Sequence, residues 1–102
     1  MQVRWTEYAA GPLDEIVDAL LDRSPELAQR VTGRILDRVG ALADLPWSGP
    51  PWRASADSTI RRLVVDDHVV IYRVVTAEDT VFVLAVRHGR QRPPDPDELP
   101  PR

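Results

Sequence analysis

The second half of the chain carries the residues that could act on an anion. Between residues 58 and 92, six arginines stand against four carboxylates, although the whole chain has a net charge of −3. Arg61, His88 and Arg90 are the candidates for catalysis, because guanidinium groups can clamp a phosphate and a histidine can move a proton near neutral pH. The arginines that are candidates for binding a target or an anionic partner are Arg62, Arg73, Arg87 and Arg92.

Other kinds of chemistry have no residues to support them. All 13 basic residues are arginine, and cysteine is absent, so lysine Schiff bases, disulfides and thiolate metal sites are excluded. We find no phosphate loop, metal-ligand cluster or nucleophile elbow, and therefore expect no cofactor and no metal. There is neither an apolar run of the ~18 residues that span a membrane nor a secretory signal. These features favour a cytoplasmic protein without a membrane partner.

Two amphipathic helices are predicted before the arginine-rich half. Apolar residues from Leu13 to Leu21 recur at helical spacing. Ser24 and Pro25 then give an N-cap and a first helical residue, and a second helix runs to about Leu45. In an antiparallel hairpin, residues whose numbers sum to 52 face each other, which predicts an apolar seam and a ladder of ion pairs. The expected pairs are Asp14–Arg38, Asp18–Arg34 and Asp22–Arg30. We favour this ladder over an anion-binding face made by the three arginines of the second helix.

A small antiparallel sheet is predicted after the helices. Residues 60–65, 69–75 and 81–87 are rich in valine and isoleucine and are separated by short turns, as in a meander of hairpins. His68 lies in the first of these turns, where we expect it to be exposed. Residues 2–6 form a further short strand. The fold class is therefore α+β, in the order β-α-α-β-β-β: an N-terminal strand, then an antiparallel helical hairpin packed on the sheet.

The remaining segments are rich in proline. Residues 46–58 form a loop in which Trp47 and Trp52 are expected to close the edge of the core rather than to stack on bases. Residues 1–92 are predicted to be a single domain. Residues 93–102 hold five prolines and three carboxylates, and we expect a flexible tail that is extended or disordered.

Five local patterns occur in a fixed order along the domain. Pro25 and Ala28 open the second helix, and Leu45-Pro46-x-x-Gly49 closes it. The other three are Arg61-Arg62-Leu63-Val64-Val65, Val70-Ile71-Tyr72-Arg73-Val74 and Val86-Arg87-His88-Gly89-Arg90. In this order and spacing, roughly residues 1–92 resemble the RelE/ParE superfamily of toxins from bacterial type II toxin–antitoxin modules. The resemblance implies the fold described above and growth inhibition that is neutralised by a cognate antitoxin.

The branch of the superfamily decides the target that the resemblance implies. ParE-like toxins inhibit DNA gyrase and hence replication, whereas RelE-like toxins are ribosome-dependent mRNA endoribonucleases with a Tyr or His in a C-terminal segment. After Arg92 this chain has no Tyr, His or Lys, and residues 63–65 of the sheet are apolar. We therefore favour the ParE-like branch, a non-catalytic toxin of the plasmid-stabilisation type whose sheet arginines bind gyrase or an acidic antitoxin segment.

Two alternatives stay open at this stage. In a RelE-like nuclease, Arg61 and Arg90 would clamp the scissile phosphate of a ribosome-bound message and His88 would act as acid or base. A degenerate homologue would bind its antitoxin and poison nothing. An exposed edge strand would also allow a homodimer or a toxin–antitoxin hetero-oligomer.

Overall fold

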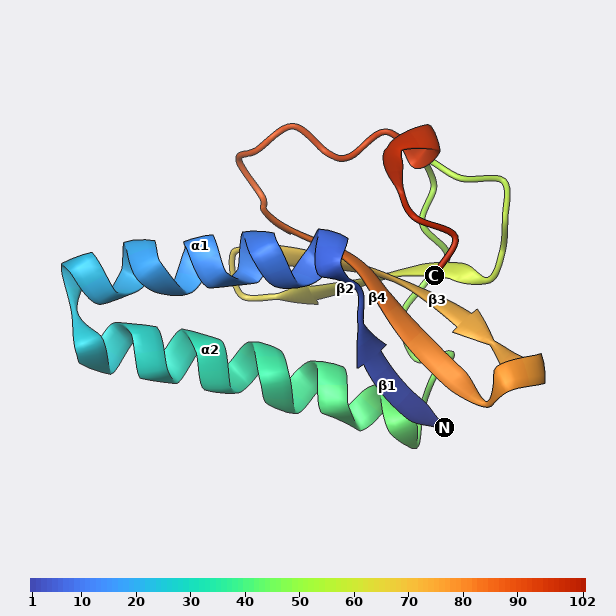
Figure 1. The fold of residues 1–102 in the computed structure, drawn as a ribbon, viewed down its shortest axis with the longest axis horizontal. Coiled ribbons are helices and arrows are strands. Elements are labelled where there is room, and N and C mark those ends of the chain that lie inside the picture. The colour runs from blue at the N-terminus through green and yellow to red at the C-terminus, as the bar shows by residue number, and fades with distance from the viewer.

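The computed structural model describes residues 1–102 and contains a helical hairpin packed on one face of a four-stranded sheet (Figure 1). The α+β fold predicted from the sequence is confirmed. Its strands and helices are β1 (Gln2–Trp5), α1 (Glu7–Arg23), α2 (Pro25–Gly40), β2 (Ile60–Val65), β3 (His68–Val75) and β4 (Thr80–His88). Three 3-10 helices complete it: η1 (Ala41–Ala43), η2 (Thr76–Glu78) and η3 (Pro96–Glu98).

The sheet has the strand order β1-β4-β3-β2. β2, β3 and β4 form the expected antiparallel meander, with Arg62 opposite Ile71 and Val69 opposite Arg87. β1 pairs in parallel with β4, which makes the sheet mixed. This parallel pairing is possible because the whole helical hairpin lies between β1 and the meander, and a parallel pair needs such a long crossover.

The two helices begin where hydrogen bonds fix the chain. The hydroxyl of Ser24 accepts the N–H of Leu27 at 3.2 Å, and Pro25 is the first residue of α2, as predicted. α1 begins at Glu7, before the apolar pattern that starts at Leu13, and it holds Pro12 inside its second turn. Its start is set by Thr6, whose hydroxyl and N–H both donate to the carbonyl of Val83, at 2.7 and 3.1 Å.

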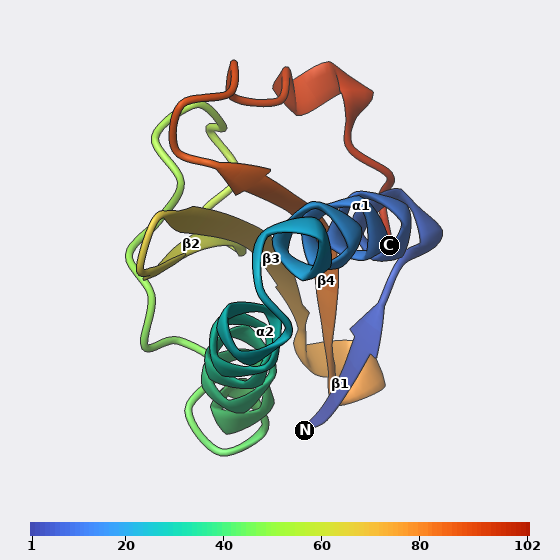
Figure 2. The same ribbon diagram turned by 90° about the vertical axis from the view of Figure 1, so that its left-hand side faces the viewer.

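The two faces of the sheet are covered by different parts of the chain (Figure 2). The hairpin covers one face, where Ile35, Val39 and Leu42 pack with strand residues such as Tyr72 in the main core. We call the other face the open face. A second cluster of Trp52, Ile60, Ile71 and Ala85 lies there, with Tyr8, Val69 and Leu99 packed against it. The loop of residues 46–58 and the C-terminal tail therefore cover part of the open face.

The predicted ladder of ion pairs between the helices is wrong. Asp14, Asp18 and Asp22 form no ion pair, and Arg34 instead binds Asp66 in the β2–β3 turn, with N···O distances of 2.7 and 3.2 Å. The reason is that α2 packs on the sheet as well as on α1, so its charged side faces the turn. Asp66 has a left-handed backbone conformation (φ 53°) at that turn.

Two aromatic side chains also differ from the expectation. His68 is buried, with 6% of its surface exposed, because it is the first residue of β3 and lies opposite His88 of β4. Trp52 closes the edge of the second cluster as predicted, but Trp47 stays 44% exposed, beneath the guanidinium of Arg61 at 4.8 Å. No helix of the structure combines the length and apolar character needed to cross a bilayer.

Candidate functional site

Strand alternation decides which arginines reach the open face. Leu63 and Val65 of β2 point into the main core, so Arg62 points away from the hairpin. On β4, Val86 points into the main core and Arg87 away from it. Because Arg62 pairs with Ile71 and Arg87 pairs with Val69, the two arginines lie on the same face, above neighbouring residues of β3.

A cavity of about 560 Å³ lies on the open face between the loop of residues 46–58 and the tail, and we call it the arginine groove. Its lining includes three arginines and no carboxylate. Apolar residues of β3 and of the loop form its floor, and two prolines of the tail form a wall. The residues that define it are Trp52, Arg53, Arg62, Ile71, Arg87, His88, Pro93 and Pro94.

Arg87 is held in position inside the groove. Its Nη2 donates to the hydroxyl of Tyr8 at 3.3 Å, its Nη1 donates to the carbonyl of Val86 at 3.2 Å, and its guanidinium lies 5.6 Å from the centre of the Tyr8 ring. Neither Arg87 nor Arg53 nor Arg62 forms an ion pair with a carboxylate. The groove therefore concentrates uncompensated positive charge above an apolar floor, an arrangement that attracts anions.

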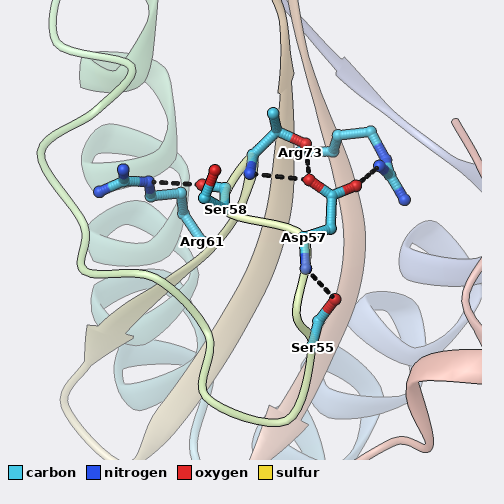
Figure 3. A network of polar contacts seen from close by, with 6 residues as sticks. Ser55, Asp57, Ser58, Arg61 and Arg73 are labelled. Carbon is cyan, nitrogen blue, oxygen red and sulfur yellow. Dashed lines mark hydrogen bonds and ion pairs between the residues drawn. The ribbon is translucent and has the colours of Figure 1, made fainter.

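Two of the arginines singled out in the sequence are bound elsewhere by the loop (Figure 3). Arg61 lies on the hairpin side of β2, where it donates to the carbonyls of Gly49 at 2.9 Å and Ser58 at 3.3 Å. Arg73 forms an ion pair with Asp57 at 2.6 Å. In the close-up, Arg61 and Arg73 point away from each other. Hydrogen bonds from Thr59 to Asp57, with help from Arg73, hold the pKa of that carboxyl below its usual range.

The three catalytic candidates are not brought together. His88 lines the arginine groove, and its Nδ1 accepts the backbone N–H of Arg90 at 3.1 Å. The side chain of Arg90 lies outside the groove, next to a smaller hollow beside Asp66 and Asp67. Arg61 is on the opposite face of the sheet from the groove, so a clamp made of Arg61, His88 and Arg90 is not assembled. The remaining candidate, Arg92, is 83% exposed and lies 3.6 Å from Glu98.

His88 is one of a pair of histidines where the start of β3 lies opposite the end of β4. The rings of His68 and His88 meet edge to face, with their centres 5.3 Å apart. The Nδ1 of His68 is buried and has no hydrogen-bond partner. Burial lowers the pKa of His68, and the neighbouring His88 lowers it further. No group of three or more His, Asp or Glu residues could hold a metal ion.

Three residues that line or support the groove were not predicted to do so. Arg53 and Trp52 lie in an irregular loop whose sequence has no periodic pattern. Tyr8, which holds Arg87, is separated from it by 79 residues. For the loop, the one sequence signal is the adjacent pair Trp52-Arg53 before the strands, and this pair does not indicate which face of the sheet the loop covers. No sequence signal indicates the contact of Tyr8 with Arg87.

Comparison with known proteins agrees with this architecture. The family model of the ParE toxin of the type II toxin–antitoxin system parDE matches residues 3–93. Two curated relatives cover most of the chain. The putative toxin Y4kP of Sinorhizobium fredii is 37% identical over 95 residues, covering 91% of this chain and 93% of the relative. Toxin RelE2 of Caulobacter vibrioides is 36% identical over 88 residues, covering 86% of this chain and 94% of the relative.

Two solved structures share the fold. A chain of the chromosomal ParDE toxin–antitoxin system from P. aeruginosa superposes with a TM-score of 0.70 at 24% identity, covering 86% of this chain and 95% of that one. A chain of the toxin–antitoxin complex RelBE2 from Mycobacterium tuberculosis gives a TM-score of 0.61 at 23% identity, covering 85% and 88%. The family match over nearly the whole domain and the two curated relatives show that this chain belongs to the ParE family of toxins, within the RelE/ParE superfamily.

Proposed function

We propose that this toxin acts in the cytoplasm by inhibiting DNA gyrase, without catalysis, and that a cognate antitoxin neutralises it. The observation that carries the proposal is the arginine groove, whose three unpaired guanidinium groups can bind carboxylates of a protein target. The separation of Arg61 from His88 supports binding rather than cleavage. Arg62 and Arg87 are the residues that we expect to contact the target.

A second cavity supports an antitoxin partner. It measures about 490 Å³ and lies between the helical hairpin and the β2–β3 turn. The apolar side chains of Ile16, Leu20, Leu27 and Val31 line it, together with His68 and His88. The two solved neighbours come from a toxin–antitoxin system and a toxin–antitoxin complex. An amphipathic antitoxin segment laid along the hairpin would bury these apolar residues.

The alternative of a RelE-like endoribonuclease is favoured by one observation. His88 follows Arg87 at the end of β4 and is among the residues that line the groove, although its ring meets His68 on the hairpin side of the sheet. A phosphate held at that end of the groove would still lie close to a residue that can move a proton. Against this function, the groove offers no exposed aromatic ring for a base to stack on, since Trp52 is only 7% exposed.

A supercoiling assay with purified gyrase tests the proposal. We expect the toxin to inhibit the reaction. The double variant Arg62→Gln/Arg87→Gln should need a concentration at least ~10²-fold higher, because it loses two charge-assisted hydrogen bonds that contribute ~1.5–3 kcal/mol each. Arg4→Gln is the matched control: Arg4 is exposed, lies outside the groove and binds only Gln2. Full inhibition by the double variant would contradict the role of the groove.

Primer extension on translated messages tests the alternative. Cuts that appear with the wild-type toxin and disappear with His88→Gln would support a nuclease and overturn the gyrase proposal. If induced expression leaves growth untouched, neither activity is present and the chain is a homologue that only binds antitoxin.

A further inference from the structure

The tail of residues 93–102 follows the open face of the sheet (Figures 1 and 2). After the end of β4 it arches over the sheet. The side chain of its last residue reaches η2, which precedes the start of the same strand. There Arg102 forms an ion pair with Glu78 of η2 at 2.9 Å. The tail thus spans the length of the face that carries the arginine groove.

Apolar contacts tie the middle of the tail to this face. Pro94 is buried at the wall of the groove. Leu99 packs against the second cluster, which contains Trp52 and Ile71 of the groove floor. The tail therefore covers apolar surface that is continuous with the floor of the groove.

The polar contacts of the tail involve the residue that positions Arg87. The carboxylate of Glu98 accepts the hydroxyl of Tyr8 at 3.4 Å and lies 3.6 Å from Arg92. Tyr8 is also the acceptor for Arg87, at 3.3 Å. Displacement of Glu98 would thus change the hydrogen bonding of the side chain that holds Arg87 in the groove.

The tail narrows the groove but does not neutralise the positive charge of its arginines. Asp95 is occupied by its own turn, where it accepts the N–H of Asp97 at 2.9 Å. None of the tail carboxylates pairs with an arginine of the groove. The anchors are exposed ion pairs, which contribute little, one long hydrogen bond to Glu98, the buried Pro94 and the partly buried Leu99. Because these anchors are few, the tail can be displaced.

We propose that residues 93–102 are an autoinhibitory strap. The strap covers part of the face that the target would bind, and an acidic, extended protein segment with an apolar side chain displaces it. The tail itself has this chemistry, with three carboxylates, five prolines and one leucine. This inference rests on the proposed function, in which the partner of the groove is a protein. The low exposure of Trp52 argues against a nucleic acid as the partner.

The test uses the full chain and a synthetic peptide with the sequence of residues 93–102. In the wild type the attached tail competes with the peptide at an effective concentration of about millimolar. Leu99→Ser releases the attached tail, so we expect the peptide to bind this variant at least ~10-fold more tightly in an NMR titration. Leu21→Ser is the matched control, since Leu21 is 48% exposed on α1, outside the groove. Equal binding to the wild type and to Leu99→Ser, or no binding to either, would overturn the strap.

A second test compares two variants that have the same net charge and that should both fold. Glu98→Gln and Asp97→Asn each remove one negative charge from the tail, but only Glu98 contacts Tyr8. We expect faster amide hydrogen exchange at Leu99, whose N–H donates to Pro96 at 3.4 Å, in Glu98→Gln alone. The same exchange rate in both variants would count against the strap. Gyrase inhibition by the wild type is measured separately, so loss of the strap and loss of the proposed function give different results.

Discussion

Gly49 connects the loop to the arginine-bearing strand, and its replacement by alanine is the sharpest test of this packing. Gly49 is buried, its N–H donates to the hydroxyl of Tyr72 at 3.0 Å, and its carbonyl accepts Arg61 at 2.9 Å. A Cβ at this position would collide with the backbone carbonyl of Arg62 and would lie 2.8 Å from the Tyr72 hydroxyl. The backbone of β2 is fixed by its pairing with β3, so rotation of a side chain cannot relieve the collision.

The expected cost follows from these contacts. Overpacking a well-packed site costs about 1–3 kcal/mol. Moving the loop aside would also leave the buried N–H of Gly49 without Tyr72, which costs about 1–3 kcal/mol. Gly49→Ala should therefore lower the free energy of unfolding by about 2–6 kcal/mol. For a chain of this size that corresponds to a decrease in Tm of roughly 10 °C or more.

Thermal unfolding followed by circular dichroism measures this change. Gly33→Ala is the control, because nothing lies within 4 Å of a Cβ at Gly33, inside α2. There alanine should raise stability by about 0.5–1 kcal/mol, since it is a better helix former than glycine. A Gly49→Ala variant that melts at the wild-type temperature would contradict this packing of the loop against β2.

Two further predictions concern ionisable groups. The lowered pKa of His68 means that the unfolded chain binds a proton that the folded chain releases. The contribution of neutral His68 to the free energy of unfolding should therefore be fully present above pH ~6.5 and should be lost as the pH falls from there through the pKa of the folded state. Urea unfolding between about pH 7.5 and pH 5.5 measures how the free energy of unfolding depends on pH. A dependence that His68→Asn does not reduce would contradict this prediction. Arg34→Asp and Asp66→Arg should each lower the stability only slightly, because the pair is exposed and screened by solvent, and the double swap should restore most of the loss. Asp18→Asn should leave the free energy of unfolding unchanged. Strong coupling between Asp18 and Arg34 in a double-mutant cycle would instead support an ion pair between the helices.

The elements were predictable because their signals are local. The Ser24-Pro25 pair fixes the start of α2, and the alternation of valine and isoleucine fixes the meander. The ladder of ion pairs is wrong because facing positions in the two helices do not alone decide where the charged side chains of α2 point. The position of α2 also depends on its packing against the sheet, and Arg34 forms its ion pair with Asp66, in a turn 32 residues further along the chain.

The candidate site was predictable only in part. The sequence located the arginines in the second half of the chain, and strand alternation separates Arg61 from Arg62. The sequence could not show that the loop brings Arg53 to the arginine groove, or that Asp57 forms an ion pair with Arg73. These contacts depend on the path of an irregular segment, for which no periodic pattern exists.

Growth after induced expression tests the central claim, that this toxin acts through the arginine groove. Wild-type toxin and the control variant Arg4→Gln should arrest the culture, whereas Arg62→Gln/Arg87→Gln, present at the same level and folded as judged by its Tm, should allow growth. Arrest by that double variant to the same extent as by the wild type would contradict the claim.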